Sequence, residues 1–259
     1  MSASRSILRR SLFCVLSMLS LAACVHQSSA ELPEGAESLD DLPNGESWDA
    51  ELRMSEGDQM RLALSAPYLA RYAGDTAYVY LGPDPALPDS VQQEVSVRLY
   101  DDEGGLTATI TSSEARYDER SEELVAEGRV RAEVSSGVGA SIASARLRAT
   151  RDGAFTASGG AAADLKGEAQ ATIRAQQISG SEGGGRYDAS GRVVVNTRSG
   201  RRLDAGQVIW NEAAGEFRAP GAFTFDGPGQ RVRGVGLTAS ADLSRYSFRR
   251  ASGQIEVRE

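Results

Sequence analysis

The sequence predicts an all-β protein built from about six two-strand repeats of roughly 30 residues, and two recurring spacings indicate it. In the first spacing, apolar or small residues stand at i, i+2, i+5 and i+7, as in Leu203, Ala205, Val208 and Trp210. Alternation with period two is typical of a strand with one covered face, and the step from i+2 to i+5 indicates a bulge or bend. The same spacing recurs from Ile110, Ile142, Ile173 and Val232.

The second spacing follows each copy of the first. It places an apolar or aromatic residue, then Ala, Gly and two further residues, at steps of two, and we expect all of them to face inward. Its copies begin at Leu124, Phe155, Tyr187, Phe217 and, with a charge, at Arg249. Their glycines, at positions 128, 159, 191, 221 and 253, are 31, 32, 30 and 32 residues apart. A fixed period indicates stacked repeats that share a continuous interior.

The first residues predict a signal peptide that is not part of the fold. A basic segment with three arginines precedes the apolar stretch 11–22, which is too short to span a bilayer. The stretch ends in Leu21-Ala22-Ala23-Cys24, which resembles the lipobox of bacterial lipoproteins. We therefore expect removal of residues 1–23 and acylation of Cys24; the alternative is an ordinary cleaved signal with a chance cysteine. Cys14 would be removed, so no disulfide is predicted.

The chain after Cys24 divides into a tether and one domain. Residues 24–47 are polar and aperiodic, which predicts a solvated tether that includes His26, the single histidine. The domain is expected over residues 48–259, beginning with a hairpin around the turn 55–58. Prolines predict a loop over 82–88, because proline donates no ladder hydrogen bond, and a strand resumes at Val91–Tyr100.

The charge is unevenly distributed. The formal net charge is −8, and removal of the three signal-peptide arginines makes it −11. From Asn196 onward, ten arginines against seven acids give a net charge of +3. We favour a solvated arginine-rich surface; the alternative is an edge that meets an acidic partner or phosphates. We expect no nucleic-acid partner.

No catalytic constellation is recognisable. The mature chain has no second histidine, nucleophile elbow or phosphate-binding loop, and Asp101-Asp102-Glu103 is interpreted as a solvated surface turn. We therefore expect no enzymatic activity, no metal site and no cofactor.

The residues expected to face inward combine large apolar side chains with many Ala, Gly and Ser, so their summed volume is low. An underfilled apolar interior suggests a groove for a ligand, and the alternative is a narrow, fully packed solenoid. The largest apolar side chains gather in the later repeats, and the expected lipid-binding residues are Ile178, Val193, Val195, Leu203, Val208, Trp210, Phe217, Phe223, Phe225 and Leu237.

Three segments carry a family resemblance. Leu106–Glu133, with its Ser-Ser-Glu-Ala-Arg-Tyr-Asp and Val-Ala-Glu-Gly-Arg-Val runs, resembles the OstA-type repeat of the LptC/LptA family of periplasmic lipopolysaccharide-export proteins. Leu203–Phe225 and Gly236–Val257 are similar to the closing repeats of the LptC branch. The resemblance implies a twisted, half-open β-jellyroll with lipopolysaccharide acyl chains between its two sheets.

The resemblance also implies a role and partners. The expected role is a periplasmic bridge that passes lipopolysaccharide from the inner-membrane transporter to the next jellyroll protein. LptA-like and LptF/LptG-like jellyrolls are the expected partners, and the edge strand Gln254, Ile255, Glu256 and Val257 would pair with them. The lipid on Cys24 would anchor the chain to a membrane, the inner membrane being favoured, whereas many relatives keep a transmembrane anchor. The alternative function is a β-repeat lipoprotein that acts only as a protein-binding scaffold.

Overall fold

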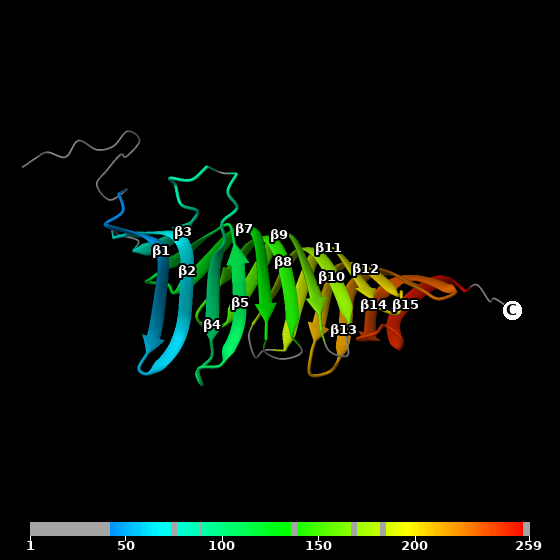
Figure 1. Ribbon diagram of the computed structural model, residues 1–259. Coiled ribbons are helices and arrows are strands. Elements are labelled where there is room, and N and C mark those ends of the chain that lie inside the picture. Colours follow the sequence, from blue (N-terminus) through cyan, green and yellow to red (C-terminus); the bar gives the residue numbers. More distant parts are fainter. Residues whose placement is uncertain are drawn as a thin grey trace, which may run out of the picture. The chain divides into compact units, whose positions relative to one another are not determined.

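The computed structural model describes residues 42–73, 77–88, 90–135, 139–166, 170–181 and 185–255, and these residues form 15 antiparallel strands and no helix (Figure 1). The predicted all-β class is therefore confirmed. The strands are β1 (Gly45–Glu56), β2 (Gln59–Tyr72), β3 (Tyr78–Gly82), β4 (Val95–Tyr100), β5 (Leu106–Ser112), β6 (Glu114–Asp118), β7 (Glu123–Val134), β8 (Ala140–Ala149), β9 (Ala154–Leu165), β10 (Ala171–Ser181), β11 (Arg186–Thr197), β12 (Arg202–Asn211), β13 (Glu216–Gly227), β14 (Gln230–Ser240) and β15 (Tyr246–Ile255).

The strands form one sheet in which neighbours in sequence are neighbours in space. From β7 to β15 each strand pairs with the next one along the chain. At two places, a pair of short strands occupies the position of one long strand. The short strands β3 and β4 both pair with β2, and the short strands β5 and β6 both pair with β7. Among the described residues, the end strands β1 and β15 each pair with a single neighbour, so each leaves one edge unpaired.

Most of the long strands bend in the middle, as the first spacing predicts for β8, β10, β12 and β14; the bends in β7, β9, β11 and β13, which carry the second spacing, were not predicted. In β7 the register shifts between Glu127 and Val130, and the two residues between them, Gly128 and Arg129, are exposed with φ angles of 73° and 51°. Such left-handed residues turn the strand and favour glycine. Gly128, Gly159, Gly191 and Gly221 of the second spacing lie at such bends, and the expectation that they face inward is wrong. A Cβ on Gly128 would lie 2.9 Å from the Ser113 side chain.

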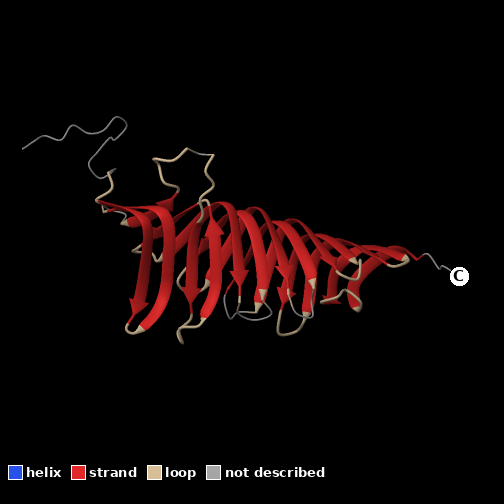
Figure 2. Cartoon of the chain, in the orientation of Figure 1, coloured by secondary structure: helices blue, strands red, loops and turns tan. Residues whose placement is uncertain are grey.

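The bends divide the sheet into two halves that enclose one core. Half-sheet A contains β4, β5 and the long-strand segments in line with them, such as 131–134 of β7. Half-sheet B contains β3, β6 and the remaining segments, such as 123–127 of β7. Figure 2 shows the strands curving over from one half to the other. Buried apolar side chains from both halves, including Val97 from A and Val79 from B, belong to a single cluster.

The predicted inward parity is confirmed for most of the repeats. The members of the first spacing that are buried in the structure include Ile110, Ser112, Ala115, Tyr117, Ile142, Ser144, Leu147, Ala149, Ile173, Ala175, Ile178, Leu203, Val208, Trp210, Val232, Leu237 and Ala239. Alternating burial thus follows the hydrophobic pattern through both halves of each strand.

The structure differs from the expectations at three places. The strand β1 begins at Gly45, inside the segment 24–47 that we assigned to the tether, because Gly45 to Trp48 pair with the end of β2. The strand β4 begins at Val95 rather than at Val91, which is exposed in the preceding loop. That loop occupies the position where other strands bend. Asp84 lies in the loop, and its Oδ1 accepts a hydrogen bond of 3.2 Å from the indole Nε1 of Trp48 in β1.

The closing repeat is the third difference. In β15 the residues opposite inward Ala239 and Leu237 are Tyr246 and Phe248, whereas Arg249 is exposed. The inward parity changes between Phe248 and Ala251, whereas the second spacing predicts no change of parity in this strand. The inward face of the last strand is therefore aromatic instead of beginning with a charge.

Turns border the opening between the two half-sheets. Among the described residues, rim A contains the turns 57–58, 101–105, 198–201 and 228–229, and rim B contains the turns 119–122, 150–153, 212–215 and 241–245. Among the described residues the rims contact each other near both ends of the sheet. Glu56 forms an ion pair of 2.9 Å with Arg151, and the Ser199 hydroxyl donates to the Asp242 carbonyl at 3.5 Å.

Candidate functional site

The ten residues predicted to bind lipid all face the core. Half-sheet A contributes Val193, Val195, Leu203, Phe223 and Phe225, and half-sheet B contributes Ile178, Val208, Trp210, Phe217 and Leu237. All ten are buried and belong to the same apolar cluster. The structure therefore brings together residues from five consecutive strands, β10 to β14.

The interior between these residues is filled by their own side chains. Phe217 and Phe225 are fully buried, and the ring centroids of Trp210 and Phe217 are 4.6 Å apart. Two cavities among the described residues, one lined by Tyr80 and Arg148 and one by Arg151, border none of the ten residues. In this structure the interior is thus a packed core, so a ligand would have to displace or separate these side chains.

The core is uncovered at both ends of the sheet. In β1 the inward side chain of Trp48 is 54% exposed, and in β15 the inward side chain of Phe248 is 43% exposed. Trp48 contacts Tyr68 on the neighbouring strand, at 5.6 Å between ring centroids, and its other side has no neighbouring strand among the described residues. Inward side chains at the two end strands therefore remain accessible.

A cross-strand row of aromatic residues lines half-sheet B beside rim B. The row contains Phe155, Gly180, Tyr187, Trp210, Phe217, Ala239 and Tyr246, each opposite the next. Gly180 leaves room for its neighbours, because a Cβ there would lie 2.7 Å from Tyr187 Cδ1. The sequence spacing identified Phe155 and Tyr187 as inward residues, but the aromatic row itself, including Tyr246, was not predicted.

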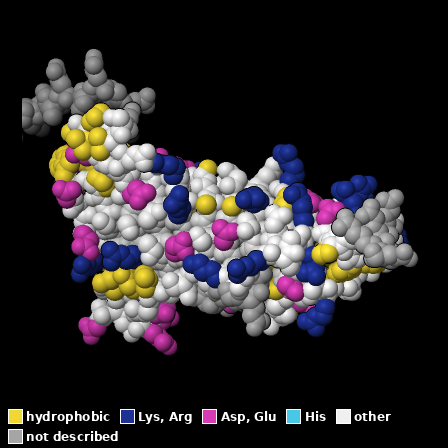
Figure 3. Space-filling view, turned by 45° about the vertical axis from the view of Figure 1, so that its right-hand side comes forward, with side chains coloured by type: hydrophobic (Ala, Val, Ile, Leu, Met, Phe, Trp, Pro, Cys, Tyr) yellow, Lys and Arg dark blue, Asp and Glu magenta, His cyan; other side chains and the backbone are white. Residues whose placement is uncertain are grey.

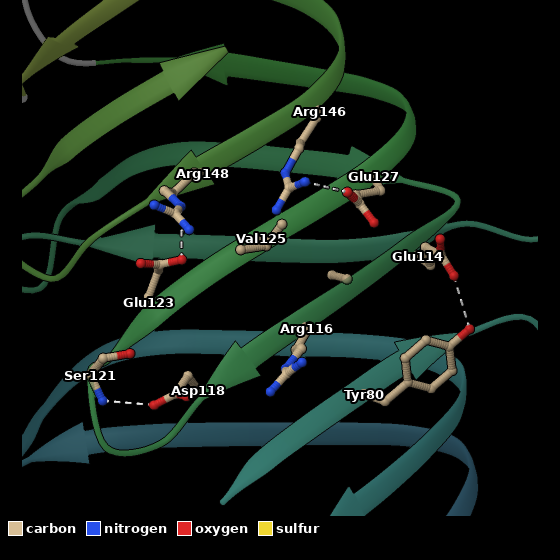
Figure 4. A pocket seen from close by; sticks show the side chains of 11 residues that line it. Tyr80, Glu114, Arg116, Asp118, Ser121, Glu123, Val125, Glu127, Arg146 and Arg148 are labelled. Atoms are coloured by element: carbon tan, nitrogen blue, oxygen red, sulfur yellow. Dashed lines mark hydrogen bonds and ion pairs between the residues drawn. The ribbon is translucent and has the colours of Figure 1, made fainter. Parts of the chain in front are cut away.

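The larger cavity lies on the outer face of half-sheet B (Figure 4) and has a volume of about 510 Å³. Ion pairs cross it, from Arg146 to Glu127 at 3.2 Å and from Arg148 to Glu123 at 2.8 Å. The hydroxyl of Tyr80 donates to Glu114, and burial, with the charge of Glu114, raises the pKa of Tyr80 to about 12. The charges and hydrogen-bonding groups of these side chains are paired with one another. The cavity is therefore an ion-paired region of the surface.

The two edges of the sheet differ in charge. Strand β1 carries four acids, Glu46, Asp49, Glu51 and Glu56, against one arginine, whereas β15 carries Arg249 and Arg250 and no acid. Figure 3 shows several Lys and Arg side chains near the C-terminal end of the sheet. The two unpaired edge strands thus share the predicted asymmetry, although β15 holds only two of the ten arginines that follow Asn196.

The predicted partner edge lies partly within the described residues. Gln254 and Ile255 belong to β15 and pair with Arg231 and Gln230 of β14, which leaves their other side free among the described strands. Glu256 and Val257 lie outside the described residues, as do Cys24 and His26.

Metal-ligating groups and membrane-spanning helices are both absent from the described residues. The described part of the chain contains no group of three His, Cys, Asp or Glu side chains that could hold a metal ion. It also contains no helix that is long and apolar enough to cross a membrane. A comparison of the chain with protein-family models and with curated protein sequences finds no match.

Proposed function

We propose that this chain is a periplasmic lipid-binding component of lipopolysaccharide export, with an interior that holds acyl chains and passes them on. The observation that carries the proposal is a continuous apolar core that is uncovered at both ends, at Trp48 and at Phe248. A protein that transfers lipid along its interior needs such ends, whereas a closed scaffold gains stability from capping them.

The energetics suit reversible binding of acyl chains. Each methylene moved from water into an apolar interior gains about 0.8 kcal/mol, so ten methylenes suffice to hold a chain without any charged contact. The rims are joined by exposed polar contacts such as Glu56 to Arg151, and exposed ion pairs contribute only about 0–1 kcal/mol. Separation of the rims therefore costs little polar stabilisation, and we propose that acyl chains enter between them.

The edge strands provide the connection to other proteins. A strand with unpaired N–H and C=O groups accepts a further strand, which is how β15 would join an LptA-like jellyroll and β1 an LptF/LptG-like one. In this proposal the acyl group on Cys24 holds the chain at the periplasmic face of the inner membrane. Opposite charges on the two edges favour one order of assembly over the reverse.

The alternative, a protein-binding scaffold without lipid, is favoured by one observation. All ten residues expected to contact lipid are buried in a packed interior. A scaffold would use the same free edges, but its core would never open.

A photocrosslinking experiment separates the two functions. Benzoylphenylalanine in place of Phe248, an inward side chain that is already exposed, should capture lipopolysaccharide in cells. The same probe in place of Leu87, an exposed loop residue, should capture none. Lipid adducts are identified by mass spectrometry. Protein adducts at Phe248 without any lipid adduct would favour the scaffold and contradict the lipid-binding proposal.

A further inference from the structure

The indole of Trp210 has an unpaired hydrogen-bond donor inside the core. The side chain is only 2% exposed, and its Nε1 has no acceptor within hydrogen-bond distance. Buried side-chain donors are normally paired, because an unpaired one loses its hydrogen bond to water without compensation. The indole N–H thus carries a polar cost that the packing of an aromatic ring does not explain.

The position of Trp210 relates this donor to the opening of the sheet. Trp210 is the penultimate residue of β12 and is the first inward residue before the turn 212–215 of rim B. It belongs to the aromatic row beside that rim, where Tyr187 and Phe217 are its cross-strand partners. The inward residues further from the rim on this strand, Val208 and Leu203, are aliphatic.

This arrangement matches the chemistry of an acyl chain that lies with its polar head outside the rims. The methylenes would contact the aliphatic residues deeper in the core. The carbonyl that links the chain to its head group would lie at the first inward level, where the sheet offers an indole N–H. A carbonyl oxygen accepts a hydrogen bond well, whereas a hydrocarbon offers no acceptor.

We infer that Trp210 Nε1–H donates to the linking carbonyl of a bound acyl chain, so that the site prefers acyl chains over ether-linked alkyl chains of the same length. The inference rests on the proposed lipid-binding function and specifies the class of chain that the interior takes. One added hydrogen bond to a buried donor predicts a preference of about threefold to tenfold.

The test uses the mature chain and two probes that differ only at the linkage: 1-myristoyl-lysophosphatidylglycerol and its 1-O-tetradecyl ether analogue. Trp48 and Trp210 are the two tryptophans of the chain, so a Trp48→Phe background leaves one indole N–H signal in a ¹⁵N-correlated NMR spectrum. The ester lipid should bind about threefold to tenfold more tightly than the ether and should shift the Trp210 signal downfield.

The Trp210→Phe variant is the matched control because it removes the N–H and keeps a large aromatic ring. It should bind the ether as the wild type does and should lose the preference for the ester. If Trp210 had only a structural role, the Trp210→Phe substitution would weaken the binding of both probes equally. The ratio of the two affinities is therefore the decisive readout. Equal binding of ester and ether by the wild type, with an unmoved indole signal, would overturn the inference and leave the lipid-binding function standing. Binding of neither probe would overturn both.

Discussion

At the scale of single residues, Leu243 shows how a turn contributes to the core. It lies in the turn 241–245 with a φ of 55°, an uncommon conformation for a bulky residue, yet its side chain is fully buried in the main cluster. Burial must therefore outweigh the backbone strain. We expect Leu243→Ala to lower the free energy of unfolding by about 2–5 kcal/mol in urea titrations. Leu87→Ala, at an exposed leucine, should change it by less than about 0.5 kcal/mol, and equal effects of the two substitutions would contradict this role.

The residue pattern predicts which side chains face inward, but not how well each polar atom is satisfied. The alternation of apolar residues identified Trp210 and Phe217 as inward-facing residues because strand parity is a local property. The unpaired indole N–H depends on what the opposite half-sheet places near it, and no spacing in the sequence encodes that.

At the scale of elements, the turn between β14 and β15 is held by Asp242. Its carboxylate accepts hydrogen bonds from the Ser240 hydroxyl at 2.7 Å and from the Ser244 amide at 3.0 Å, and these lower the pKa of Asp242 to about 2. The carboxylate pKa is lower in the folded than in the unfolded chain, where it is about 3.9. Its stabilising contribution is therefore complete above about pH 4 and is lost as the pH falls towards 2.

The Asp242→Asn variant tests this role of the turn. It should unfold at lower urea concentration than the wild type at neutral pH, and the difference should shrink as the pH falls below about 4. Urea titrations over this range measure it. A difference that stays constant from neutral pH to about pH 2 would show that the ionised carboxylate is not the stabilising group.

Elements also show where sequence reasoning reaches its limit. The bends in β8, β10, β12 and β14 were predicted, because each changes the parity of the apolar residues and so leaves a local signal. The bends in β7, β9, β11 and β13 were not predicted, because two adjacent residues turn outward there and the apolar residues on either side keep their spacing of two. The bend in β15 was not predicted, because the template placed Arg249, Ala251 and Gly253 on one face, whereas Phe248 and Ala251 lie opposite the inward residues Leu237 and Gly234. The ion pair of Glu56 with Arg151 joins the end of β1 to a turn that is far away in sequence, and only the curvature of the sheet brings them together.

At the scale of the whole described sheet, the central claim is that acyl chains reach a packed interior when the rims separate. The opening between the half-sheets is bridged at one end by an ion pair between Glu56, the exposed last residue of β1, and Arg151 of the exposed turn 150–153. A covalent link at this place should keep the rims together without altering the buried residues.

The most direct test therefore links Glu56→Cys and Arg151→Cys with a short bis-maleimide that contains a reducible disulfide, and follows the uptake of purified lipopolysaccharide by native mass spectrometry. The account predicts that the linked protein takes up lipopolysaccharide much more slowly than either single-cysteine variant, and that reduction of the linker restores uptake. Unchanged uptake by the linked protein would contradict entry between the rims.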